Sequence, residues 1–177
     1  EGPERAVLAK LKATGSPDGP RPRALAAIRE ADDDRRRLYP DPLSLELREA
    51  IARRSGLTAA HVFVGNGSDE VLAHAFQAFF DHGAPVLFPD VTYSFYPVYC
   101  GLYRLPFETV PLDEELRVRV EAYGRPASGV VLANPNAPTG IALGLEDIEK
   151  LLAAHPDRVV LIDEAYVDFG AESAVSL

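Results

Sequence analysis

The feature that most constrains the fold is an alternation of short apolar segments with longer amphipathic ones. The clearest apolar segment, Val159–Ile162, is rich in β-branched residues, as in a parallel strand buried on both faces. Strands are predicted at residues 62–64, 86–88, 104–110, 130–133 and 159–163. Helices are predicted at residues 22–32, 45–55, 69–80, 92–100, 114–123 and 145–154. This alternation predicts an α/β fold, with a mostly parallel sheet between two layers of helices.

Composition narrows the classes of protein that the chain can belong to. A net charge of −9 argues against binding to nucleic acid or to an anionic membrane. No apolar segment is long enough to span a bilayer, and Cys100 is the only cysteine. The four histidines do not have the spacing of metal ligands, so no metal site is expected. We therefore expect a cytoplasmic protein without an intrachain disulfide.

Polar residues follow the strand at 159–163 directly. Ligands of open α/β sheets bind just beyond the carboxyl ends of the strands, where Asp163 and Tyr166 are placed. A buried carboxylate needs a partner, and a protonated pyridine nitrogen supplies both a proton and a positive charge. Such a pair keeps the ring protonated and electron-withdrawing, and Tyr166 can donate to a ring oxygen. The structural alternative is a surface Asp-Glu pair at the end of a core strand.

A glycine turn at residues 65–69 connects a short apolar segment to a predicted helix. Free N–H groups and the positive end of the helix dipole suit a phosphate there, and Gly65 and Gly67 let the backbone approach it. The alternative is an ordinary strand-to-helix connection in which Ser68 or Asp69 is the N-cap.

Two further loops follow predicted strands. Residues 134–140 contain two asparagines whose side-chain amides can donate to a phenolate-type oxygen, although turns favour the same residue types. Tyr93 offers a ring that can stack on a flat cofactor, or a packing residue with its hydroxyl at the surface. Together with Asp163 and Tyr166, these loops indicate a site for pyridoxal phosphate.

With these motifs in this order, the chain resembles the fold-type I pyridoxal-phosphate-dependent aminotransferases. Within them it is most similar to the histidinol-phosphate aminotransferases, from about Lys10 to Leu177. The resemblance rests on four segments: residues 38–42 (LYPDP), 65–70 (GNGSDE), 134–140 (NPNAPTG) and 163–166 (DEAY). It implies the three-layer large domain of that fold, incomplete, with an N-terminal arm. Residues 1–57 are expected to form the arm and a small-lobe segment, and residues 58–177 the first part of the cofactor-binding large domain.

The resemblance also implies roles for individual residues around the cofactor phosphate. Gly67, Ser68 and Asp69 would hold the phosphate at the helix N-terminus. Tyr39 would reach the phosphate of the neighbouring subunit, which implies a homodimer with shared active sites.

Around the pyridine ring, the resemblance implies that Tyr93 stacks on the ring, Asp163 pairs with its nitrogen and Tyr166 hydrogen-bonds the 3-hydroxyl oxygen. The chain departs from the family at Ala137, because the residue before Pro138-Thr139-Gly140 is usually the asparagine that touches that oxygen. Asn136 is the candidate to replace it.

Two further departures concern the substrate and the nucleophile. Asp18 stands where the family has a tyrosine that shapes the substrate site. The Schiff-base lysine of the family lies beyond the equivalent of Leu177, and none of Lys10, Lys12 and Lys150 lies in a matching motif. The 177-residue chain alone is therefore expected to be inactive.

The implied activity of the full-length protein is amino transfer between histidinol phosphate and the 2-oxoglutarate/glutamate pair, in histidine biosynthesis. The substrates would be small amino compounds and 2-oxo acids. The alternatives are another aminotransferase, a threonine-phosphate decarboxylase-like enzyme, or a non-catalytic truncated domain that binds pyridoxal phosphate or phosphate. A doubly wound nucleotide-binding domain is disfavoured because the chain lacks a G-x-G-x-x-G turn and a Walker lysine.

Overall fold

The computed structural model describes residues 19–177, so Asp18, Lys10 and Lys12 lie outside the described residues. The chain divides into two units, Glu1–Ser44 and Leu45–Leu177. The described part of the first unit contains helix α1 (Pro22–Glu30), which begins with a proline in its first turn, and a short 3-10 helix. The lobe boundary expected after residue 57 stays a prediction about the complete fold.

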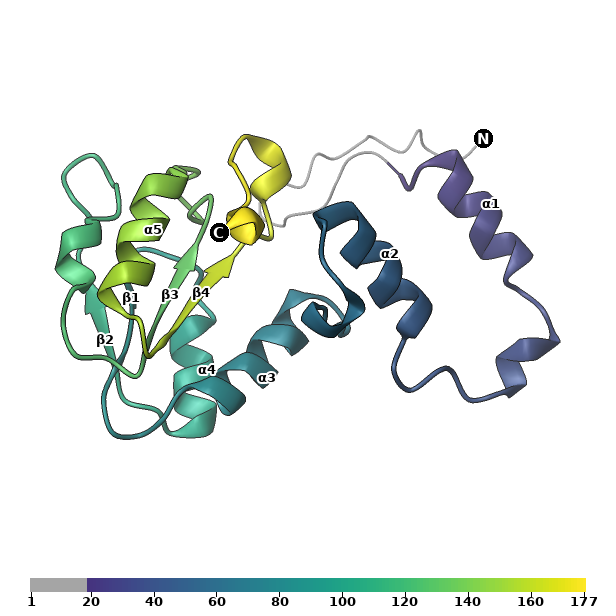
Figure 1. Ribbon diagram of the computed structural model, residues 1–177, viewed down its shortest axis with the longest axis horizontal. Helices are drawn as coiled ribbons and strands as arrows, with labels where there is room; N and C mark the ends of the chain where they lie inside the picture. The colour runs from purple at the N-terminus through teal and green to yellow at the C-terminus, as the bar shows by residue number, and fades with distance from the viewer. Residues whose placement is uncertain (1–18) are drawn as a thin grey trace, which may run out of the picture. The chain divides into compact units, whose positions relative to one another are not determined.

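A four-stranded sheet forms the centre of the second unit (Figure 1). The strands are β1 (Val86–Pro89), β2 (Phe107–Val110), β3 (Gly129–Ala133) and β4 (Val159–Asp163). Their spatial order is β2-β1-β3-β4, and every neighbouring pair is parallel. The predicted parallel sheet is therefore confirmed. Within residues 19–177, β4 is an edge strand whose outer side has no strand partner.

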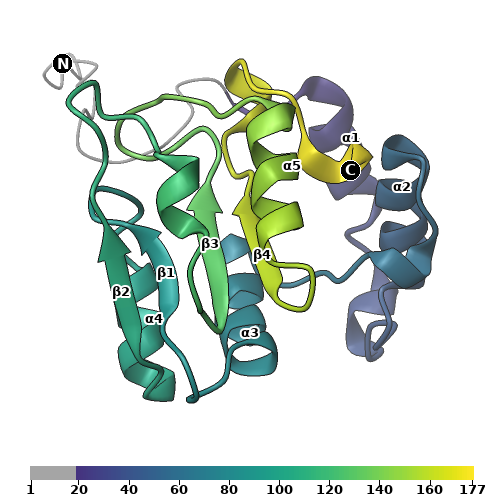
Figure 2. The same ribbon diagram turned by 60° about the vertical axis from the view of Figure 1, so that its left-hand side comes forward.

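Helices cover both faces of this sheet, which confirms the three-layer α/β/α class. The α-helices of the second unit are α2 (Leu45–Ser55), α3 (Ser68–Phe79), α4 (Tyr96–Tyr103) and α5 (Leu145–Ala154). Short 3-10 helices lie at Ala59–His61, Val120–Tyr123, Val167–Phe169 and Ala174–Ser176. Figure 2 shows α5 in front of the sheet and α3 and α4 behind it. No helix within residues 19–177 is long and apolar enough to cross a membrane.

Each face of the sheet packs against its own apolar cluster because side chains alternate along a strand. One cluster joins α3 and α4 to Val86, Phe88 and Val131. The other joins α5 and the segment around Tyr123 to Leu87, Val130 and Leu132. The apolar residues of β1 and β3 are almost completely buried, as expected for strands covered on both faces.

Gly129, the first residue of β3, allows the close approach of α3 and β4. A Cβ atom at this position would collide with Cε1 of Phe80 and lie 2.7 Å from the carbonyl oxygen of Val159. Val159 is the strand partner of Gly129, so its carbonyl oxygen cannot move away without disturbing the pairing of β3 with β4. The packing of the sheet against α3 therefore depends on a glycine here.

The strand prediction at residues 62–64 was wrong. These residues have no strand partner in the described part of the chain, although the backbone of Val62 is extended. Apolar β-branched residues favour a strand only where another strand pairs with them. Here the carbonyl of Val62 instead accepts a hydrogen bond from the Arg48 side chain, at 2.7 Å.

The helix predicted at 114–123 is also wrong except for its last turn, the 3-10 helix Val120–Tyr123. The Asp113 carboxylate accepts hydrogen bonds from the amides of Glu115 and Arg117, and Leu116 has a φ of 62°. Such local side-chain bonds compete with helix formation. The helix predicted at 92–100 begins later, at Tyr96, because Pro97 occupies its first turn. The strand predicted at 104–110 is shorter, since Arg104 adopts a left-handed conformation after α4.

Candidate functional site

Three loops meet at the carboxyl ends of β1, β3 and β4. The amide of Asn134, just after β3, donates to the carbonyl oxygen of Asp163 at 2.9 Å. Asn136 Nδ2 donates to the carbonyl oxygen of Val91, in the loop after β1, at 3.0 Å. The predicted convergence of these loops is therefore present, at the edge of the sheet where ligands of α/β folds bind.

The Asp163 carboxylate lies at this edge of the sheet, at the end of β4. Asp163 is the last residue of β4 and is half-buried. Its Oδ2 atom accepts a hydrogen bond from the Tyr96 hydroxyl at 2.9 Å, and its Oδ1 atom accepts one from the Ala165 amide at 3.2 Å. An ionised carboxylate accepts about four hydrogen bonds. Asp163 therefore retains acceptor capacity for a positively charged donor.

Tyr93 lies beside this group, with its hydroxyl held at the start of α3. The hydroxyl donates to Asp69 Oδ1 at 2.7 Å, and the Tyr99 hydroxyl donates to the same oxygen at 3.1 Å. Burial raises the pKa of Tyr93 to about 12, and Asp69, Asp163 and Tyr166 add smaller electrostatic contributions. Asp69, Asp163 and Tyr166 are thus all within electrostatic reach of Tyr93.

The start of α3 presents backbone N–H groups next to Asp69. The first-turn amides of a helix have no intrahelical acceptor. Gly67, the N-cap, has a φ of 81°, and no atom outside its chain neighbours lies within 4 Å of the place that a Cβ would take. The Glu70 carboxylate turns back to the Asn66 amide at 2.6 Å, and this bond lowers the pKa of Glu70. Gly67 consequently borders open space at the start of the helix.

Asn136 is almost completely buried, and its side chain is fully engaged with neighbouring loops. Its Nδ2 atom donates to Val91 and to Thr139 Oγ1, while its Oδ1 atom accepts from the Thr92 hydroxyl at 2.8 Å. These contacts join the loops after β1 and β3. The geometry thus favours a positioning role for Asn136 over the direct cofactor contact expected for it.

Tyr166 follows β4 and is partly exposed, with its ring 6.2 Å from that of Phe169. Its hydroxyl has no hydrogen-bond partner within the described part of the chain. Glu164, by contrast, binds Ser173 Oγ and the Ala174 amide, both at 2.6 Å, and so has a structural role. Tyr39 belongs to the other unit, where its side chain is fully exposed.

Tyr96, Tyr99 and Thr92 were not predicted from the sequence to have a role in this site. The spacing of Tyr93, Tyr96 and Tyr99 is the available signal, because residues three apart lie on one side of a helix. Their acceptors, Asp163 and Asp69, are distant in sequence, so the hydrogen bonds themselves are visible only in the fold.

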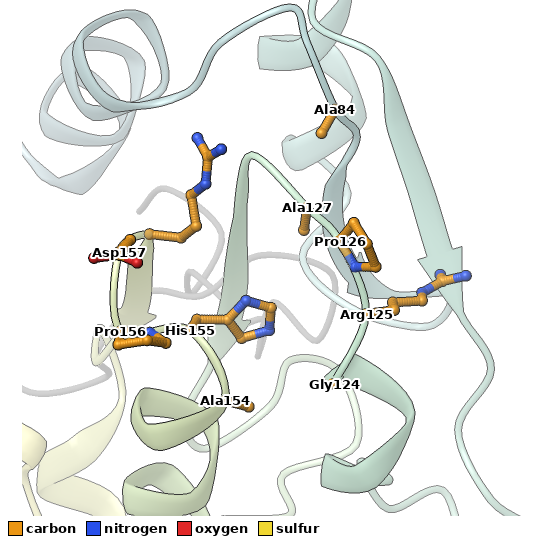
Figure 3. Close-up of a pocket in the computed structure, with 10 residues that line it drawn as sticks. Ala84, Gly124, Arg125, Pro126, Ala127, Ala154, His155, Pro156 and Asp157 are labelled. Atoms are coloured by element: carbon orange, nitrogen blue, oxygen red, sulfur yellow. The ribbon is translucent and has the colours of Figure 1, made fainter.

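A cavity of about 420 Å³ lies at the opposite end of the sheet from the candidate site, where the strands begin (Figure 3). The His155 ring points toward the segment Gly124–Ala127, and its Nε2 atom is 2.8 Å from the carbonyl oxygen of Tyr123. The arginines of its lining are neutralised locally: Arg125 pairs with Glu108 at 2.9 Å, and Arg158 with Asp81 at 3.0 Å. Because it is remote from the carboxyl ends of the strands, this cavity is separate from the candidate site.

Comparison with known proteins agrees with this geometry. Residues 10–177 match the profile of the family described as aminotransferase class I and II. The chain belongs to this family. It is 68% identical, over all of its 177 residues, to a histidinol-phosphate aminotransferase of Acetobacter pasteurianus, and 56% identical to one of Pseudomonas putida. It covers 50% and 51% of those proteins, so the chain spans about half the length of the curated relatives it matches.

Solved structures show the same fold. The crystal structure of histidinol-phosphate aminotransferase from Sinorhizobium meliloti in complex with pyridoxal-5'-phosphate matches with a TM-score of 0.79 and 31% identity, over 88% of this chain and 44% of that one. An L-threonine-O-3-phosphate decarboxylase from Porphyromonas gingivalis matches with a TM-score of 0.69 and 26% identity, over 85% and 45% of the two chains.

Proposed function

We propose that the complete protein containing these residues is a pyridoxal-phosphate-dependent histidinol-phosphate aminotransferase. It transfers an amino group between histidinol phosphate and the 2-oxoglutarate/glutamate pair. The observation that carries this proposal is the Asp163 carboxylate, fixed at the end of β4 with acceptor capacity to spare. The similarity to histidinol-phosphate aminotransferases over the whole chain supports the choice of substrate.

The donors and acceptors around Asp163 fit the chemical groups of pyridoxal phosphate. The cofactor offers a phosphate, an aromatic ring, a basic ring nitrogen and a phenolic oxygen. The first-turn amides of Ser68 and Asp69 suit the phosphate, and the partly buried Tyr93 suits the ring face. Asp163 suits the protonated nitrogen. The Tyr166 hydroxyl, which has no hydrogen-bond partner among residues 19–177, suits the phenolic oxygen.

When bound, pyridoxal phosphate supplies an electron-withdrawing ring and an aldehyde carbon that carries the amino group. The residues of this chain bind and orient it. Asp163 holds the proton on the ring nitrogen, because a nearby negative charge favours the charged form of that nitrogen. Asp69 orients the Tyr93 ring by accepting a hydrogen bond from the Tyr93 hydroxyl at 2.7 Å. The backbone N–H of Asp69 remains part of the phosphate site.

The part of the chain that the structure describes supplies no lysine to the proposed active site. Among residues 19–177 the lysine is Lys150, on the exposed side of α5, and its Nζ atom is 2.7 Å from Asp147 Oδ1. Lys150 is thus engaged away from the carboxyl ends of the strands. The proposal further includes a cytoplasmic homodimer in which the exposed Tyr39 hydroxyl reaches the phosphate site of the neighbouring subunit.

The test is an assay of the complete gene product, purified and loaded with pyridoxal phosphate. We expect a visible absorption band from the bound cofactor and formation of glutamate from histidinol phosphate and 2-oxoglutarate. Threonine phosphate is the competing substrate, and release of carbon dioxide from it would instead favour the decarboxylase. A protein that binds no pyridoxal phosphate at millimolar concentration would refute the proposal. Elution of the loaded protein as a monomer would refute only the proposal that two subunits share their active sites.

A further inference from the structure

Tyr96, which hydrogen-bonds Asp163, is tightly enclosed by its neighbours. Its side chain is completely buried at the first residue of α4. Its ring centroid lies 5.5 Å from that of Tyr93, in an edge-to-face arrangement, and 5.8 Å from that of Phe88. Because the ring is enclosed in this way, the Tyr96 hydroxyl points toward Asp163 and donates to its Oδ2 atom at 2.9 Å.

The Asp163 side chain needs such a support because little else holds it in place. Within residues 19–177 it ends an edge strand and is only half-buried. Its second carboxylate contact is the longer bond from the Ala165 amide, at 3.2 Å, which comes from two residues further along the same loop. Tyr96 is therefore the side chain that ties the carboxylate to the core.

The hydroxyl of Tyr96 remains a proton donor throughout the physiological range. Burial, together with the charge of Asp163 and the hydrogen bond between them, raises the pKa of Tyr96 far above the usual tyrosine value. The neighbouring tyrosines do not compete for Asp163, because Tyr93 and Tyr99 both donate to Asp69. The Asp163 carboxylate thus has Tyr96 as its tyrosine donor, whereas the Asp69 carboxylate has Tyr93 and Tyr99.

We propose that Tyr96 is a positioning residue, whose hydroxyl fixes the Asp163 carboxylate in the orientation that engages the ring nitrogen of pyridoxal phosphate. This inference rests on the proposed cofactor site. Without the hydroxyl, the carboxylate keeps only the longer bond from the Ala165 amide and samples more orientations, and that added freedom must be lost when the cofactor binds. A preoriented carboxylate binds the cofactor more tightly and keeps the ring nitrogen protonated more completely.

The experiment compares Tyr96→Phe with the matched control Tyr123→Phe in the complete gene product. Both substitutions remove one hydroxyl from a completely buried ring, but the Tyr123 hydroxyl has no hydrogen-bond partner within the described residues and packs on the opposite face of the sheet. Two quantities are measured: the dissociation constant of pyridoxal phosphate from the apoprotein, and the ¹⁵N chemical shift of the ring nitrogen in bound, ¹⁵N-labelled cofactor at one pH.

Tyr96→Phe is expected to weaken cofactor binding about tenfold, equivalent to about 1.4 kcal/mol. It should also move the ¹⁵N shift toward the deprotonated value, while Tyr123→Phe matches the wild-type protein in both measurements. The inference is overturned if Tyr96→Phe leaves both quantities at their wild-type values, or if Tyr123→Phe changes them equally. Absence of cofactor binding by the wild-type protein would instead mean that the proposed function itself had failed.

Discussion

Replacing Gly129 by alanine tests the close packing of β3 against α3 and β4. The added methyl group meets the Phe80 ring and the Val159 carbonyl oxygen at distances shorter than van der Waals contact. Overpacking of this kind costs about 1–3 kcal/mol, and the upper end applies because one of the two contacts is backbone. Loss of glycine's freedom in the unfolded chain returns up to about 1 kcal/mol. We therefore expect Gly129→Ala to lower the free energy of unfolding by about 2 kcal/mol.

The assay is urea unfolding of the apo form of the complete protein, followed by circular dichroism. Gly101→Ala is the matched control, because Gly101 is an exposed residue of α4 with no atom near its missing Cβ. Alanine is the better helix former, so this control should raise the free energy of unfolding by about 0.8–1 kcal/mol. A Gly129→Ala protein as stable as the wild type would refute the steric role assigned to this glycine.

A second comparison separates the two contacts of the methyl group. Phe80→Leu shortens the side chain that the methyl group meets, whereas the Val159 carbonyl remains in place. In this background, Gly129→Ala should cost about 1 kcal/mol, half its cost in the wild type, because contacting residues are not additive. An equal cost in both backgrounds would contradict a role for the Phe80 ring.

Three further predictions concern the site. Asp163→Asn removes the negative charge that pairs with the ring nitrogen, and loss of one partner of a buried charge pair costs about 2–5 kcal/mol. The dissociation constant of pyridoxal phosphate should therefore rise at least about thirtyfold. Unchanged binding would exclude the pairing of Asp163 with the ring nitrogen. Asp69→Ala removes the carboxylate oxygen that accepts from the Tyr93 and Tyr99 hydroxyls, and Tyr99 keeps only its 3.2 Å bond to the backbone carbonyl of residue 69. The free energy of unfolding should therefore fall by about 1–2 kcal/mol in urea, whereas Asp69→Asn, which keeps an acceptor oxygen, should cost less than half of that. Because the folded-state pKa of Tyr93 is raised to about 12, its contribution to stability is complete below the usual tyrosine pKa of about 10 and is lost as the pH rises through 12. Ultraviolet titration that finds every tyrosine of the folded protein largely ionised at a pH of about 11 would contradict this raised pKa.

The sequence predicts the fold best where local pattern and burial agree. Strand β4 and helix α5 begin and end at the predicted residues, because an apolar β-branched segment and an amphipathic segment leave few alternatives. The errors at 62–64 and 114–123 arose where the outcome depends on a partner. A strand requires another strand, and a helix competes with side-chain hydrogen bonds such as those of Asp113.

The candidate site was predictable to the level of residue types at strand ends, but not to the level of hydrogen bonds. The positions of Asp163, Tyr93 and Tyr166 follow from the rule that ligands bind at the carboxyl ends of strands. The acceptor of each tyrosine does not follow from any local pattern. Asp69, expected only at the phosphate, accepts hydrogen bonds from Tyr93 and Tyr99, and the asparagine expected at the cofactor joins two loops.

Asp163 is anchored by two different elements, one at its side chain and one at its backbone. The Tyr96 hydroxyl of α4 holds the carboxylate, whereas the Asn134 amide at the end of β3 holds the backbone carbonyl. A small shift of α4 would therefore turn the carboxylate while the backbone of Asp163 stays hydrogen-bonded to Asn134. For a protein engineer, the packing of α4 is thus a place away from the cofactor contacts at which the direction of the Asp163 carboxylate can be adjusted.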